Sequence, residues 1–348
     1  MDGYIKPMID ISIPGPYIQL DIVPLTLFYM VISYLDYYLY CRTTLTFSKY
    51  KHWHRLYHLI LPFLFAPKRQ AFSTAFIAFP WFVASVGAYS TQLYKYQQLK
   101  LEGPPQSFKD YVISVGIEGL SSQGPEENKQ EGVRVEGVRR VLNHIIIMAL
   151  GKALLTPILL HDPKLLLAMP WYSWNSIWFG FLMGFKGYTL MLSTDMGLAT
   201  IQILTGVSTL HVFNRPFLAS SPKDFWGNRW NLVVRNLFRK QLYTKEKKPA
   251  RELAYHRCLA FLVSGLMHEG IMTLANRTLT LEQFCFFTLH GFAVLLQSLV
   301  STRISSKLPR SVSIVLTMLF FGCTSQLFLA PFLRYEEQCA LFGQHSFI

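Results

Sequence analysis

The sequence predicts an all-α polytopic membrane protein with about eight transmembrane helices and an amphipathic helix at the membrane interface. Of its 348 residues, 51% are hydrophobic and only 15% are charged, whereas an ordinary globular chain carries about 25% charged residues. A helix needs about 20 apolar residues to cross a bilayer. The runs without acidic or basic residues that approach this length are 71–94, 165–185, 196–214, 283–302 and 311–333.

Three further spans are expected where polar residues interrupt an apolar run, at 17–40, 141–160 and 254–275. The segment 56–66 is short and contains Pro62, which favours an interfacial or re-entrant piece, with a ninth span as the alternative. No internal repeat and no long linker divides the chain. We therefore predict one integral membrane domain over residues 1–348.

The net charge of +13 resides mainly in short connections between the apolar runs. The connections 41–70, 215–253 and 303–310 are basic, whereas 95–140 is balanced in charge. With eight spans the basic connections share one face, which the positive-inside rule makes cytoplasmic. This distribution argues against a nucleic-acid partner, which requires a basic solvated surface. The five cysteines are scattered, which argues against a disulfide framework or a thiolate metal site.

One expected span contains the motif SGLMHEG, at residues 264–270. If the helix starts near residue 254, His268 lies roughly 21 Å along it, deep in the bilayer. Ser264 is one turn earlier on the same face, and Gly265 leaves room for a substrate or another helix. A neutral imidazole in an apolar site can accept a proton from a hydroxyl group. His268 is therefore a candidate general base.

Two alternatives for His268 stand beside this hypothesis. One is a buried structural histidine bonded to a neighbouring helix, which we weigh about equally with a functional role. A zinc protease motif requires a second histidine four residues after the first, and Met272 occupies that position. We therefore expect no metal at this motif.

A second candidate region begins at residue 220 with the sequence SSPKDFWGNRWN. On a helical wheel its tryptophans share one stripe with the apolar residues that follow, which predicts an amphipathic interfacial helix over 224–239. A plain membrane anchor is the common meaning of such a pattern. The functional hypothesis is that its polar and basic residues bind substrate, with an amide donor for an oxyanion at Asn231. The predicted binding residues, with one from the other motif, are Asp224, Trp226, Arg229, Trp230, Arg235, Arg239 and Ser264.

Six other polar residues fall inside the expected spans, and we interpret them as structural or as lining a cavity. They are Asp36, His144, Lys152, Lys186, Asp195 and His290. Lys186 and Asp195 are nine residues apart, so they do not share a helix face and no local pair is expected.

The two motifs together resemble the wax synthase branch of the membrane-bound O-acyltransferases. The resemblance rests on the run PFLASSPKDFWGNRWNL at 216–232 and on FLVSGLMHE at 261–269, within a motif region of 216–275. The family's motifs read like SLxDFWGRRWN and SGLxHE. Pro222 and Asn228 depart from that pattern, at positions where the family commonly has Leu and Arg.

The resemblance implies acyl transfer from acyl-coenzyme A to a lipophilic alcohol, most simply a long-chain fatty alcohol that gives a wax ester. A sterol or terpenoid alcohol is the alternative acceptor. His268 would be the general base, and Asn231 would orient the substrates or stabilise the oxyanion. No bound cofactor is implied, because coenzyme A is a cosubstrate. The endoplasmic reticulum membrane is the expected location. The identity of the alcohol, the acyl length and the oligomeric state stay open.

Two rival functions come from other classes. A lipid transporter would also carry polar residues inside its spans, although it typically shows broken helices in corresponding halves of the chain. A catalytically inactive lipid-binding scaffold would lack one of the catalytic residues, and both His268 and Asn231 are present.

Overall fold

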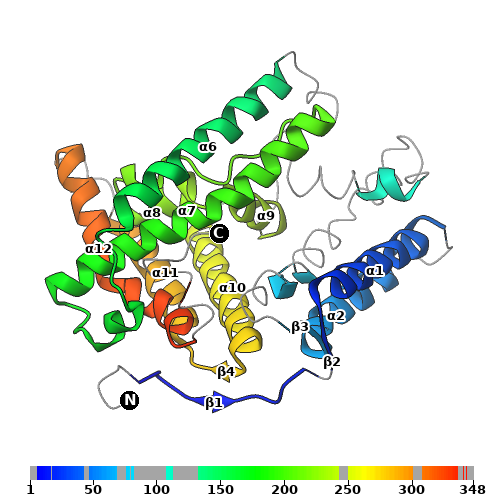
Figure 1. The fold of residues 1–348 in the computed structure, drawn as a ribbon, viewed down its shortest axis with the longest axis horizontal. Coiled ribbons are helices and arrows are strands. Elements are labelled where there is room, and N and C mark those ends of the chain that lie inside the picture. Colours follow the sequence, from blue (N-terminus) through cyan, green and yellow to red (C-terminus); the bar gives the residue numbers. More distant parts are fainter. Residues whose placement is uncertain are drawn as a thin grey trace. The chain divides into compact units, whose positions relative to one another are not determined.

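The computed structural model is helical for most of its described length (Figure 1). It describes residues 6–16, 18–42, 47–68, 76–78, 80–81, 107–112, 132–242, 250–300, 308–335, 340 and 342. The chain divides into a smaller compact unit, Ser12–Glu127, and a larger one formed by Met1–Ile11 and Asn128–Ile348. The prediction of a single functional domain stays a prediction.

Two helices make up most of the described part of the smaller unit, α1 (Ile22–Arg42) and α2 (Phe47–Leu64). The strand β2 (Ile18–Leu20) precedes α1, and β3 (Phe65–Pro67) follows α2. These strands pair in parallel, with Ile18 opposite Phe65. Leu25, Tyr29 and Leu61 form the buried core of the unit.

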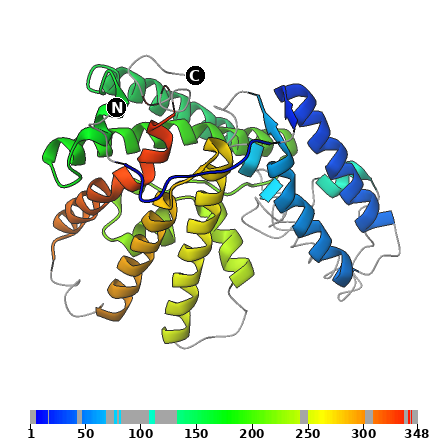
Figure 2. The ribbon, with the colours of Figure 1, turned by 90° about the horizontal axis from the view of Figure 1, so that it is seen from below.

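Five long helices build the described part of the larger unit. They are α6 (Val133–Leu155), α7 (Trp174–Thr205), α10 (Ala250–Asn276), α11 (Glu282–Val300) and α12 (Arg310–Leu333). The helices α6 and α7 pack against each other, as do α10 and α11, and α12 packs against both α7 and α11. Figure 2 shows the α6–α7 pair running across the direction of α10 and α11. The helices α10, α11 and α12 therefore form one group, and α12 joins this group to the α6–α7 pair.

Short elements connect these helices. The 3₁₀ turns are η2 (Pro163–Ala168) and η3 (Pro216–Leu218), followed by α8 (Pro222–Asp224), the π-helical turn η4 (Phe225–Arg229) and α9 (Leu232–Leu242). The strand β1 (Ile11–Ser12) pairs with β4 (Thr278–Leu279), which lies between α10 and α11.

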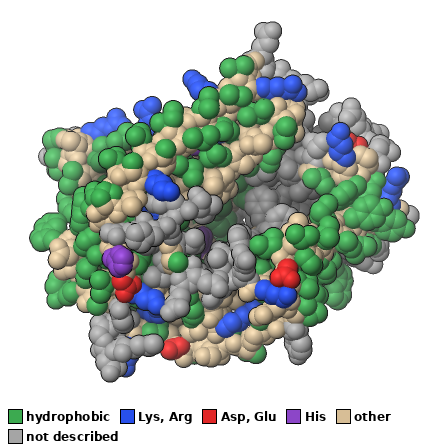
Figure 3. Space-filling view, viewed as in Figure 1, with side chains coloured by type: hydrophobic (Ala, Val, Ile, Leu, Met, Phe, Trp, Pro, Cys, Tyr) green, Lys and Arg blue, Asp and Glu red, His purple; other side chains and the backbone are tan. Residues whose placement is uncertain are grey.

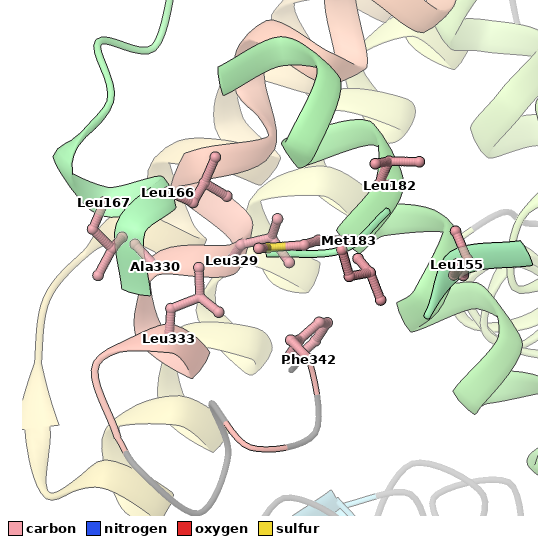
Figure 4. Close-up of a cluster of buried hydrophobic side chains, with 10 residues drawn as sticks. Leu155, Leu166, Leu167, Leu182, Met183, Leu329, Ala330, Leu333 and Phe342 are labelled. Atoms are coloured by element: carbon pink, nitrogen blue, oxygen red, sulfur yellow. The ribbon is translucent and has the colours of Figure 1, made fainter. Parts of the chain in front are cut away.

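An apolar core lies where α6, α7 and α12 meet η2 (Figure 4). Its centre is formed by side chains that are almost fully buried, such as Leu166, Met183 and Leu333. Gln326 of α12 reaches the same region and donates to the carbonyl oxygens of Leu166 and Met169, at 2.8 Å each. This core fixes α12 against α7, and thereby positions the helix on which α11 packs.

A buried ionic network holds α6 to α7. The guanidinium group of Arg140 donates to both carboxylate oxygens of Asp195, at 2.8 and 2.5 Å. His144 contacts the same carboxylate, and the backbone N–H of Val212 donates to it at 2.6 Å. Asp195 thus holds α6 to α7, which fits the structural interpretation. Its side-chain partners Arg140 and His144 lie on α6, and its backbone partner Val212 follows α7.

The predicted number of about eight spans is not confirmed. In the described part, three helical segments are long and apolar enough to cross a membrane, Ile22–Leu39, Tyr255–Asn276 and Arg310–Leu333. The two spans expected at 165–185 and 196–214 are wrong as separate helices, because α7 runs unbroken from residue 174 to residue 205. The polar residues between them do not end α7, and Lys186 and Asp195 are buried within it.

Other boundaries also differ from expectation. The segment 56–66 is the end of the 18-residue helix α2, which continues through Pro62, followed by β3. The expected span at 71–94 lies almost wholly outside the described residues.

Long helices in both units present apolar faces to their surroundings (Figure 3). Exposed apolar residues of α6 are Val135, Val138, Leu142, Ile145, Ile146, Leu150 and Leu154. Those of α1 include Val23, Leu27, Met30, Val31, Tyr34, Leu35 and Tyr38. Contiguous apolar surface of this extent suits hydrocarbon rather than water. Together with the three apolar helices, it indicates a membrane protein.

Candidate active site

The first motif does not form the continuous amphipathic helix predicted for 224–239. The helix stops after the π-helical turn η4, because Trp230 is extended and Asn231 has a left-handed backbone with φ of 44°. A new helix, α9, then starts at Leu232. Asn is one of the few non-glycine residues that adopt this conformation readily. The first motif is therefore a compact turn and not a continuous interfacial helix.

The charged residues of this turn bond to one another. The Asp224 carboxylate accepts from Arg229 Nε at 2.7 Å, from Asn228 Nδ2 at 3.2 Å and from the Ser220 backbone N–H at 3.2 Å. Burial alone would raise the pKa of Asp224, but these hydrogen bonds and the Arg229 charge outweigh it and lower that pKa below its ordinary value. The carboxylate is therefore ionised at neutral pH and holds the turn together. A substrate contact for Asp224 or Arg229 stays a prediction.

Asn231 begins α9. Its side-chain oxygen accepts from the backbone N–H of Val234 at 3.3 Å, in the manner of an N-cap. No hydrogen bond from its Nδ2 atom is found within the part of the chain that the structure describes. The oxygen thus has a structural task, and the amide N–H groups are the atoms suited to meet a substrate oxygen.

The two arginines of α9 differ in what can be said of them. Arg235 turns back and donates from Nη1 to the carbonyl oxygen of Gly227 at 2.8 Å, which braces α9 against η4. The side chain of Arg239 lies outside the described residues. A role for either in binding coenzyme A phosphates stays a prediction.

The tryptophans of the first motif pack between helices. Trp226 Nε1 donates to Nδ1 of the fully buried His290 at 3.1 Å. Because Nδ1 accepts this bond, the other nitrogen, Nε2, carries the proton and donates to Thr324 Oγ1 at 3.0 Å. His290 therefore links the first motif to α12, and its structural interpretation fits this geometry. Trp230 packs on Phe225 with ring centroids 5.3 Å apart.

In the second motif, the residues around His268 hold α10 against α11. A Cβ atom at Gly265 would lie 3.2 Å from Phe287 Cβ and 3.3 Å from the Phe284 carbonyl oxygen, so glycine permits the close approach of the two helices. The buried Glu269 carboxylate accepts from four backbone N–H groups at the start of α11. The donors are Thr280 at 3.0 Å, Leu281 at 2.7 Å, Gln283 at 3.0 Å and Phe284 at 3.3 Å. Glu269 thus caps α11, which also suits the positive end of that helix.

The hydrogen bond of His268 fixes its tautomer. Its Nδ1 atom lies 2.8 Å from the carbonyl oxygen of Ser264 and 3.5 Å from the Ser264 hydroxyl. A carbonyl oxygen only accepts, so Nδ1 carries the proton and Nε2 of the neutral ring has a lone pair. No hydrogen-bond partner for Nε2 is found among the residues that the structure describes. This half-buried imidazole has the electronic state that a general base requires.

One side chain links the two motifs. The Phe287 ring of α11 lies 4.2 Å from the His268 ring and 5.6 Å from the Trp226 ring, measured between centroids. The structure thus brings Trp226, Ser264 and His268 around one aromatic cluster. The sequence analysis missed Phe287 as well as the capping role of Glu269. The signal for Glu269 was its place beside His268, where a carboxylate inside an apolar run requires donors.

Comparison with known proteins confirms the resemblance over this region. A model of the membrane bound O-acyl transferase family matches residues 210–289, which contain both motifs. A putative long-chain-alcohol O-fatty-acyltransferase 10 of Arabidopsis thaliana is 35% identical over 127 residues, which are 33% of this chain and 36% of that protein. The long-chain-alcohol O-fatty-acyltransferase of Simmondsia chinensis is 34% identical over 159 residues, 41% of this chain and 45% of that protein.

A relative that is named for a different acceptor is similar to the same degree. The acyl-CoA–sterol O-acyltransferase 1 of Arabidopsis thaliana is 33% identical over 146 residues, 39% of this chain and 42% of that protein. The chain thus matches less than half the length of each of these three relatives. The family match includes the whole motif region, and the similarity to these relatives extends over more residues than that region contains.

Proposed function

We propose that this protein is an acyl-coenzyme A-dependent O-acyltransferase that esterifies a long-chain fatty alcohol. The observation that carries the proposal is the state of His268. Its Nδ1–H group is bonded to the Ser264 carbonyl oxygen, which leaves the Nε2 lone pair to accept a proton in an apolar helix. That helix lies in the segment that matches the O-acyltransferase family.

The proposed reaction needs one base and one oxyanion donor. Nε2 of His268 takes the hydroxyl proton of the alcohol while the oxygen attacks the thioester carbonyl carbon. The resulting tetrahedral oxyanion accepts a hydrogen bond from Nδ2 of Asn231, which the capping bond of Oδ1 to Val234 N–H keeps in place. The C–S bond then breaks, the imidazolium returns its proton to the coenzyme A thiolate, and the ester leaves.

The surroundings of His268 favour lipophilic substrates. Phe287 and Phe328 lie 4.2 and 6.5 Å from its ring, between centroids, and α10 is apolar enough to span a membrane. A long alcohol can therefore approach through hydrocarbon, while the phosphates of coenzyme A stay on the polar side. We propose the endoplasmic reticulum membrane as the location of the protein.

A sterol is the second candidate acceptor, because a relative named as a sterol acyltransferase is as similar as those named for long-chain alcohols. Both acceptors present one hydroxyl group on a large apolar body, so the base and the oxyanion donor serve either. Selection between a sterol and a long-chain alcohol would depend on the shape of the path by which the alcohol reaches His268.

The test is expression of the chain in a host that lacks neutral-lipid acyltransferases, with fatty alcohol or sterol supplied. We expect wax esters from the fatty alcohol, and no ester from the His268→Ala variant at equal protein level. His256→Ala is the matched control, since it removes an imidazole from the same helix about 18 Å away along the axis. If sterol esters form and wax esters do not, the acceptor is a sterol and not a long-chain fatty alcohol. A chain that accumulates but makes no ester from either alcohol would favour a transporter or a scaffold.

A further inference from the structure

A cluster of three buried polar side chains lies in the smaller unit, which does not contain His268. Asp36 comes from α1, and His54 and His58 come from α2. The exposed fraction is 0% for Asp36, 0% for His54 and 2% for His58. The two histidines are four residues apart, so they share one face of α2 and point together toward the carboxylate.

The distances within the cluster are those of a ligand set. The Nε2 atom of His58 lies 3.0 Å from Asp36 Oδ2, and Nε2 of His54 lies 3.5 Å from the same oxygen. One potential ligand atom from each residue lies within 4.8 Å of the others. Ligands about 2.0–2.2 Å from a tetrahedral ion are roughly 3.3–3.6 Å apart. Small side-chain rotations therefore suffice to place an ion between the three groups.

The charge of Asp36 has less compensation than the charges of the buried Asp195 and Glu269. Asp195 is paired with Arg140, and Glu269 accepts from four backbone N–H groups. Among the described residues, Asp36 has no Lys or Arg partner, and its Oδ1 atom is buried without a hydrogen bond. A buried carboxylate oxygen without a donor is costly, and a bound cation would remove that cost.

We propose that Asp36, His54 and His58 bind one divalent transition metal ion, with zinc the best match to these ligands. Two imidazole nitrogens and one carboxylate oxygen are a ligand set that zinc accepts, with a fourth position for water or another group. The same set also serves iron. The ion ties α1 to α2, across the chain segment that separates them in sequence. The sequence analysis expected no metal on the evidence of the scattered cysteines and of Met272 in the His268 motif, and it did not consider these three residues together. Asp36 is 18 and 22 residues away from the two histidines, and no local spacing rule reports a contact of that range.

The plain alternative is a hydrogen-bonded cluster in which the carboxylate accepts from one or both imidazoles. It explains the short contact between His58 and Asp36 but leaves Asp36 Oδ1 without a partner among the described residues. It also predicts that the purified protein contains no stoichiometric metal. Metal content therefore separates the two explanations.

The test uses the full chain, purified in detergent without an affinity tag, stripped with a chelator, reloaded with zinc and washed. Elemental analysis should find about one zinc per chain, the stoichiometry of a single site. His54→Ala and His58→Ala should lose this zinc, because even a lost supporting residue costs about 10–100-fold in affinity and a lost ligand costs more. His52→Ala is the matched control, since His52 is exposed on the same helix. It should retain the wild-type zinc content.

A second measurement guards against variants that do not fold. The stripped wild-type chain, titrated with cobalt(II), should develop visible absorption bands, and equimolar zinc should abolish them. Wild-type protein that binds neither zinc nor cobalt after reloading would overturn the proposal. Retention of the full zinc content by folded His54→Ala and His58→Ala variants would overturn it as well.

Discussion

The Nδ1 atom of His268 lies 2.8 Å from the backbone carbonyl oxygen of Ser264, one turn earlier on α10. The ring is therefore held by the backbone of its own helix and not by a carboxylate on another element. Any residue at position 264 that preserves the helix offers the same carbonyl oxygen. This separates the orientation of the base from the chemistry of the Ser264 side chain.

Replacement of Ser264 by alanine should therefore leave kcat near the wild-type value. Replacement of His268 by alanine should lower kcat about 10²–10⁴-fold, because the general base is lost. The measurement is ester formation per folded protein in detergent or vesicles. If the Ser264 hydroxyl binds substrate, Ser264→Ala raises KM at constant kcat. A fall of kcat in Ser264→Ala as large as in His268→Ala would contradict orientation by the backbone.

Asn231 offers a sharper test, because its two side-chain atoms have different tasks. Asn231→Asp keeps an oxygen that can accept from Val234 N–H and tolerates the left-handed backbone, but it removes the amide donor. We expect kcat to fall about 10²–10³-fold, the scale of one lost oxyanion donor, with little change in KM for acyl-coenzyme A.

Asn231→Gly is the companion variant. Glycine also adopts a φ of 44° without strain, but it removes both the cap and the amide. Its loss of kcat should match that of Asn231→Asp, with a small added loss of stability from the missing cap. Near-normal kcat in a folded Asn231→Asp variant would exclude Asn231 as an oxyanion donor.

The membrane character and the two motifs were predictable from sequence, whereas their contacts were not. Apolar runs indicate that a helix is present but not where it ends. They predict two spans at 165–185 and 196–214, whereas α7 is unbroken between residues 174 and 205. The charge of Asp195 inside α7 is balanced by Arg140, which lies 55 positions earlier in the sequence. No local spacing rule reports a contact of that range.

The first motif shows the same limit at short range. A helical wheel assumes one helix, and it placed Trp226 and Trp230 on one membrane-facing stripe. The π-helical turn at Phe225–Arg229 and the extended backbone of Trp230 break that assumption, and Trp226 instead donates to His290 inside the protein. The expected anchor is therefore a turn that contacts α11.

The bond between Trp226 and His290 should contribute to stability. Trp226→Phe removes the Nε1 donor and leaves Nδ1 of the buried His290 without it, at a cost of about 1–3 kcal/mol. Trp230→Phe is the matched control, because Trp230 contacts other rings and makes no side-chain hydrogen bond among the described residues. Thermal unfolding in detergent measures the difference. Equal midpoints for the two variants would show that the bond contributes nothing beyond packing.

Glu269 should act on folding rather than on chemistry. Glu269→Gln places an amide group against backbone N–H donors of α11 and removes a charge-assisted cap, which should cost at least about 1.5–3 kcal/mol. Glu136→Gln is the control, since Glu136 is about half exposed and surface ion pairs contribute little. Specific activity per folded Glu269→Gln molecule should stay near wild type. A fall in kcat without a loss of stability would give Glu269 a direct role in the reaction.

The close approach of α10 to α11 at Gly265 positions His268. A single added methyl group at this residue should therefore lower both stability and kcat. In Gly265→Ala the new Cβ atom would lie 3.2 Å from Phe287 Cβ and 3.3 Å from the Phe284 carbonyl oxygen. Because one of these neighbours is backbone, the helices must separate, which typically costs about 1–3 kcal/mol. Phe287 packs on the His268 ring, so the shift should also lower kcat.

Gly197→Ala is the matched control for this last substitution. Gly197 also lies inside a long helix, α7, but a Cβ atom there meets nothing within 4 Å. Alanine should stabilise that helix by up to about 1 kcal/mol through its higher helix propensity. Thermal unfolding should therefore show a lower midpoint for Gly265→Ala and an equal or higher midpoint for Gly197→Ala. Ester formation should fall only in Gly265→Ala. If Gly265→Ala is as stable and active as Gly197→Ala, close packing of α10 on α11 does not hold the base in place.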